Sequence, residues 1–129
     1  MPQAKNLLKL STICLPKPDA MDIVITREFK KNYKHLASKY ASLASDLQTL
    51  RAQLMENPFL GVELSGGFRK IRLSIRSKGK GKSGGARVIT FNYIVDQACQ
   101  RIVLVKMYDK SEAGNVTDAE IKRAFNTLD

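Results

Sequence analysis

The chain has 129 residues, which is room for one domain with a hydrophobic core of its own. Hydrophobic residues make up 43% of it and charged residues 26%, which excludes wholesale disorder. No apolar run approaches the roughly 18 residues of a membrane-spanning helix, and two distant cysteines, Cys14 and Cys99, give neither a disulfide framework nor a multi-cysteine zinc site. We therefore expect a soluble, cytoplasmic protein, and its net charge is +10.

Residues 1–20 are predicted to be an N-terminal extension of a domain that residues 21–129 form. Lysines interrupt the apolar residues of this segment, so it lacks the apolar core of a signal peptide, and Pro16 and Pro18 then break the chain. A regular domain pattern begins directly afterwards, and we expect Met21 to be a natural start of the protein.

A strand and a helical hairpin are predicted for the first part of the domain. Residues 22–27 are rich in β-branched side chains, which favours a strand. Ser42 is a candidate N-cap between two helices, and Asn57-Pro58 ends the second, because a residue before proline avoids the α-helical region. Apolar side chains recur at helical spacing at Phe29, Tyr33, Leu36, Ala37 and Tyr40, and again at Leu43, Leu47, Leu50 and Leu54. We expect both apolar stripes to pack on a sheet.

Residues 68–76 alternate between apolar and polar side chains, the pattern of a half-buried strand. The core face would carry Ile71, Leu73 and Ile75. The opposite face would carry Lys70, Arg72, Ser74 and Arg76. The composition of residues 78–85 then predicts a loop.

Two more strands and a helix complete the predicted fold. Residues 87–95 and 102–108 are typical of strands, with a turn at 97–101, and the almost continuously apolar 102–108 should lie inside the sheet. Thr117 and Glu120 form a capping box ahead of a C-terminal helix. The order β-α-α-β-β-β-α predicts an α+β fold, in which a helical hairpin packs on a single curved, mostly antiparallel sheet.

The positive charge is concentrated in one segment. Residues 65–87 carry 8 basic side chains and 0 acidic ones, so they account for most of the net charge. Like charges on neighbouring positions repel, and a strand face and loop of this kind are tolerated when an anion relieves the repulsion. The segment therefore points to a polyanionic partner, either nucleic-acid phosphate or an acidic protein segment.

The glycines of this segment do not make a nucleotide-binding loop. Gly79, Gly81 and Gly84 match G-x-G-x-x-G, but Arg76 stands where a P-loop needs its first glycine. Both nucleotide motifs also need a helix after the loop, and here a strand is predicted.

The other chemically capable side chains have ordinary structural explanations. His35 is expected on a helix surface, and Cys99 is expected to be a bystander. Asp96, Asp109 and Glu112 match no metal-binding loop in their spacing, so capping and surface roles account for them.

Four motifs together resemble the RelE/ParE toxin superfamily, and within it the HigB-like branch of type II toxin–antitoxin systems. They are Asn-Pro-x-x-Gly (57–61), Gly-Gly-Phe-Arg-Lys-Ile-Arg (66–72), Lys-Gly-Lys-x-Gly-Gly-x-Arg (80–87) and Tyr-Asp-Lys-Ser-Glu (108–112). The resemblance covers about residues 21–127 and implies a RelE-like fold. It further implies a prokaryotic ribosome-dependent mRNA interferase without metal or cofactor, whose partners are mRNA, the ribosome and a cognate antitoxin.

The resemblance also assigns roles to individual residues. Lys70 would be the general base, Arg72 and Arg87 would stabilise the phosphate, and Lys110 would act as acid or charge stabiliser. Tyr108 would stack on a base or orient the phosphate. RelE itself has a further tyrosine shortly after the basic residue, where this chain has Asn115, Val116 and Thr117. The basic side chains expected to bind RNA are Arg69, Arg76, Lys78, Lys80, Lys82 and Lys106.

Two alternatives stay open from the sequence. A ParE-like toxin would inhibit DNA gyrase and cleave nothing, but it would not need the cationic strand. A non-catalytic RNA- or ribosome-binding module would use the same lysines for binding alone.

Overall fold

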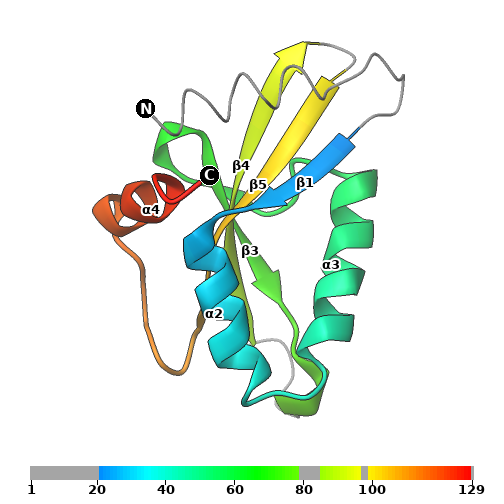
Figure 1. The fold of residues 1–129 in the computed structure, drawn as a ribbon, viewed down its shortest axis with the longest axis vertical. Coiled ribbons are helices and arrows are strands. Elements are labelled where there is room, and N and C mark those ends of the chain that lie inside the picture. Colours follow the sequence, from blue (N-terminus) through cyan, green and yellow to red (C-terminus); the bar gives the residue numbers. More distant parts are fainter. Residues whose placement is uncertain (1–20, 79–84, 97–98, 129) are drawn as a thin grey trace.

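The computed structural model describes residues 21–78, 85–96 and 99–128 of the chain. Its elements are β1 (Met21–Ile25), α2 (Arg27–Ala37), α3 (Leu43–Glu56), β2 (Val62–Glu63), β3 (Phe68–Leu73), β4 (Ala86–Asp96), β5 (Cys99–Asp109) and α4 (Asp118–Phe125) (Figure 1). None of the helices in these ranges has the length and the apolar run that crossing a bilayer requires.

The strands form one mixed sheet in the order β1-β5-β4-β3-β2. β1 runs parallel to β5, and the other neighbours are antiparallel. The predicted α+β class and the predicted order of helices are therefore confirmed. The expectation that the apolar strand lies inside the sheet is also confirmed, because β5 has a neighbour on both sides.

The predicted strand over 68–76 is wrong in its last three residues. β3 ends at Leu73, and a 3-10 turn (Arg76–Lys78) follows. The buried carboxylate of Asp46 in α3 accepts hydrogen bonds from the backbone N–H and the Nε of Arg76, both at 3.1 Å. These bonds turn the chain toward α3, so Arg76 does not extend the cationic face of the strand.

Two smaller predictions also need correction. The turn predicted over 97–101 is too long, because β5 already begins at Cys99 and pairs with Asp96 of β4. The sequence also did not predict β2, whose two residues pair with Arg69 and Lys70 of β3. A strand this short has too few residues to show an alternating pattern.

Hydrophobic residues fill a separate core on each face of the sheet. Neighbouring positions alternate between the two cores: Val88, Ile102 and Leu104 belong to the first, and the residues directly after them to the second. The first core lies under α2 and α3, as the predicted hairpin requires, and the second lies under α4. Figure 1 shows α4 to one side of the two hairpin helices.

The predicted starts of α3 and α4 are correct, but the strand predicted over 22–27 is too long, because β1 ends at Ile25 and α2 begins at Arg27. Thr117 accepts a hydrogen bond from the Glu120 backbone N–H at 3.2 Å, which confirms Thr117 as the N-cap of α4. Ser42 occupies the N-cap of α3, but its hydroxyl donates to Asp46 and makes no cap bond.

Candidate functional site

The strand register places three of the predicted site residues in one row across the sheet. Arg72 of β3 is the direct partner of Arg87 in β4, and Arg87 is the direct partner of Tyr108 in β5. Side chains at paired positions project from the same face, with Cβ atoms about 5 Å apart. This arrangement brings together residues that lie up to 36 positions apart (72 and 108) in the sequence.

Lys70 belongs to the same face of β3 as Arg72. The two residues are separated by one position, so they lie about 7 Å apart along the strand. Phe68, on the same face two positions earlier, packs in the core under α4. Lys70 is half-buried and Arg72 is exposed. We name Lys70, Arg72, Arg87 and Tyr108 the sheet-face cluster.

Arg87 is a buried cation that has no acidic partner in the described part of the chain. It is 5% exposed, and its Nη1 donates to the backbone carbonyl of Ala86 at 3.2 Å. Among the described residues, no carboxylate forms an ion pair with Arg72 or Arg87. Two like charges at directly paired positions destabilise a sheet, and a buried charge without compensation is costly. An anion placed on this face would relieve both costs.

Tyr108 adds a neutral donor beside these charges. Burial raises the pKa of its phenol above the ordinary value of 10.0, and the nearby charge of Arg87 lowers the pKa by a smaller amount. The phenol therefore keeps its proton at neutral pH. An O–H and two guanidinium groups are donors suited to the oxygens of a phosphate.

The sheet-face cluster is open to solvent at the outer edge of β3. Lys70 and Arg72 line a groove of about 580 Å³ between this edge and the C-terminal half of α3. β2 pairs only with Arg69 and Lys70, and among the described residues no strand lies beside the edge of β3 beyond them. A ligand can therefore reach Lys70 and Arg72 from this side.

Three of the other predicted RNA-binding side chains are engaged within the protein. Arg69 donates to the backbone carbonyl of Gly61 at 2.9 Å, and Arg76 pairs with Asp46. Lys106 forms an ion pair with Glu28 at 3.2 Å. These contacts hold loops and helices in place. Lys80 and Lys82 lie outside the described residues, as does the side chain of Lys78.

Lys110 stands apart from the sheet-face cluster, in the turn that follows β5. Its side chain is exposed, and its backbone N–H donates to the carbonyl of Gly85 at 3.4 Å. Gly85 is two residues before Arg87, so this turn lies at the end of the sheet that carries Arg72, Arg87 and Tyr108.

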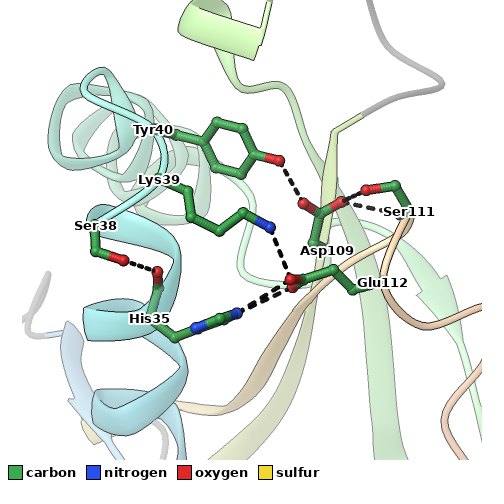
Figure 2. Close-up of polar contacts among 7 residues, drawn as sticks. All are labelled: His35, Ser38, Lys39, Tyr40, Asp109, Ser111 and Glu112. Atoms are coloured by element: carbon green, nitrogen blue, oxygen red, sulfur yellow. Dashed lines mark hydrogen bonds and ion pairs between the residues drawn. The ribbon is translucent and has the colours of Figure 1, made fainter.

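A polar cluster beside Lys110 is a feature that the sequence reasoning missed. Figure 2 shows His35, in the last turn of α2, and Lys39, in the turn that follows the helix, directed at Glu112. Lys39 Nζ lies 2.7 Å from the carboxylate, and His35 Nε2 lies 3.2 Å from each of its oxygens. The expectation that His35 is on a helix surface is correct, but its acidic partner is 77 positions away, where no local spacing could reveal it.

Acid should weaken the contact between Glu112 and Lys39. The hydrogen bond from Lys39, and then that from His35, lower the pKa of Glu112 below its ordinary value of 4.5. The same bond raises the pKa of Lys39 above 10.5. The interaction thus stabilises the folded state at pH values between 4.5 and 10.5, where both groups are charged. This stabilisation is lost as the pH falls through the lowered pKa of Glu112, and it is also lost as the pH rises through the raised pKa of Lys39.

We expect Glu112→Gln to lower the urea midpoint slightly at neutral pH, because both partners are exposed, and to have a smaller effect at about pH 3. The measurement is urea unfolding at both pH values, with Glu56→Gln as the control. A difference between wild type and Glu112→Gln that grows on acidification would contradict the assignment.

No known protein-family model matches the chain. In the ranges that the structure describes, no group of three or more His, Cys, Asp or Glu side chains is arranged to hold a metal ion. The RelE/ParE resemblance stays a prediction that the sequence motifs carry.

Proposed function

We propose that this protein is the toxin of a type II toxin–antitoxin system and that it cleaves mRNA on the ribosome. The observation that carries this proposal is the direct pairing of Arg72 with Arg87, which is buried and has no acidic partner among the described residues. The proposal that the substrate is RNA and that cleavage takes place on the ribosome rests on the sequence motifs. The cognate antitoxin would cover the same cations with an acidic segment.

The proposed reaction is an internal transesterification of RNA. Lys70 in its neutral form takes the proton of a ribose 2′-OH, and the 2′-oxygen attacks the adjacent phosphorus. The bond from phosphorus to the 5′-oxygen breaks, and Lys110 gives that oxygen a proton. The products are a 2′,3′-cyclic phosphate and a 5′-OH, so no atoms are added or lost.

The sheet-face cluster suits the charge that this reaction develops. Negative charge builds on the phosphate oxygens in the transition state, and preorganised donors aimed at it lower the barrier. Arg72, Arg87 and the Tyr108 hydroxyl supply such donors from three adjacent strands. Because they stand on a sheet, their spacing changes little when the substrate binds.

Arg87→Met tests the proposal, because it separates function from stability. Removing a buried charge that faces a like charge should leave the free energy of unfolding unchanged or raise it. Cleavage should nevertheless fall about 100- to 1000-fold, the usual cost of losing a charge-stabilising donor. The assay induces the full-length chain, maps the 5′-ends of a translated message and measures urea unfolding in parallel.

Arg51→Met is the matched control, since Arg51 is an exposed arginine of α3 that lies outside the sheet-face cluster. It should cleave as wild type does. Growth arrest with intact message and altered DNA supercoiling would overturn the proposal in favour of a ParE-like gyrase inhibitor. RNA or ribosome binding without growth arrest or cuts would favour the non-catalytic module.

A further inference from the structure

We propose that His35 at the C-terminal end of α2, together with Lys39 and Tyr40 in the segment that follows it, positions Lys110 for catalysis by holding the turn that carries it at two points. This inference rests on the proposed function, because it assigns Lys110 a part in the reaction. The residues concerned lie outside the sheet-face cluster and make no contact with substrate in the proposed reaction. They are therefore positioning residues.

The first hold is at Asp109, directly before Lys110. Asp109 is 1% exposed, and its Oδ2 accepts a hydrogen bond from the Tyr40 hydroxyl at 2.6 Å. Its Oδ1 accepts from the backbone N–H and the hydroxyl of Ser111, at 2.9 Å and 2.7 Å. The residues on both sides of Lys110 are thus joined through one buried carboxylate.

The second hold is at Glu112, two positions after Lys110. His35, in the last turn of α2, and Lys39, in the turn directly after α2, both contact its carboxylate. The backbone N–H of Glu112 also donates to the Asp109 carbonyl at 3.0 Å, which closes the turn. Figure 2 shows both holds side by side.

The Lys110 side chain itself takes no part in these contacts. Within the described part of the chain it forms no ion pair with a carboxylate, and it is exposed. The contacts of His35, Lys39 and Tyr40 with the carboxylates of Glu112 and Asp109 therefore hold the chain on either side of an exposed cation. The arrangement leaves the ammonium group available while restricting where it can go, as a proton donor to a leaving group requires.

The test uses Tyr40→Phe and Lys39→Gln in the full-length protein. Tyr33→Phe and Lys30→Gln are matched controls, because they make the same chemical changes within α2, at residues that take no part in the two holds. Single-turnover cleavage of a defined message on translating ribosomes gives kcat and KM. Amide hydrogen exchange of residues 110–113 reports directly on the turn.

We expect each test variant to lower kcat about ten-fold with little change in KM, and to speed amide exchange in the turn. In a Lys110→Ala background the same substitutions should have no further effect on kcat. The controls should change neither quantity.

If the substitutions lowered kcat equally in the presence and absence of Lys110, the positioning role would be overturned. A rise in KM with unchanged kcat would also overturn it. Unchanged exchange in the turn would overturn the two holds themselves, whether or not the protein cleaves RNA. If the wild-type protein cleaves no RNA, the proposed function is refuted, and so is the role of Lys110 in catalysis. Faster amide exchange of residues 110–113 in the variants would then show that the contacts stabilise the turn without serving a reaction.

Discussion

Replacing Lys70 with alanine should lower mRNA cleavage about 100- to 10,000-fold, the range expected for loss of a general base. The free energy of unfolding should change by no more than about 0.5 kcal/mol, because Lys70 is half-buried on the polar side of β3 and forms no ion pair in the described part of the chain. The measurement pairs 5′-end mapping of a translated message with urea unfolding of the same preparation.

Lys30→Ala is the control for Lys70→Ala, because it removes an exposed lysine from α2, away from the sheet-face cluster. It should keep full cleavage and full toxicity. If Lys70→Ala also kept its toxicity, the proton transfer would have to be assigned to another residue, and the role that the family resemblance gives Lys70 would be wrong.

Gly61→Ala should destabilise the fold by about 3 kcal/mol, the upper part of the range for a side chain forced into a packed site. Gly61 has φ +95°, which disfavours any other residue. A Cβ there would lie 2.5 Å from the carbonyl oxygen of Lys70 and 2.7 Å from the Ile71 side chain. The substitution therefore pushes on β3 at the proposed base, and cleavage should fall together with stability.

Gly114→Ala provides the comparison, because a Cβ at that position meets nothing within 4 Å. Its free energy of unfolding should differ from that of wild type by less than about 1 kcal/mol. Both variants are measured by their urea midpoints. A stable Gly61→Ala protein would mean that the loop of residues 57–61 can move away from β3, and that it does not determine where Lys70 stands.

Part of the candidate site could be predicted because it depends on short-range patterns. Alternation along β3 puts Lys70 and Arg72 on one face, and this needs only residues two positions apart. The same reasoning failed for Arg76, since Asp46 of α3 turns the chain before the strand reaches it. A buried carboxylate from another element is invisible to any pattern within the strand.

The glycine-rich segment shows where local reasoning is sufficient. The prediction that a strand follows it is confirmed by β4, so the helix that a phosphate-binding nucleotide loop requires is not there. In the sequence, Gly61 is only one position of the Asn-Pro-x-x-Gly motif. Its physical role, a close approach to the backbone of β3, required the position of that strand.

The sequence by itself determined the order of the helices and of every strand except β2, the hairpin of α2 and α3, and the cationic face of β3, because periodicity and capping act within a few residues. Only the tertiary structure decided that Arg72, Arg87 and Tyr108 share one row, since that depends on the register of three strands. It also decided that the end of α2 and the segment directly after it meet Glu112 and Asp109. Such contacts join segments about 70 positions apart, and they follow from how helices pack on a sheet.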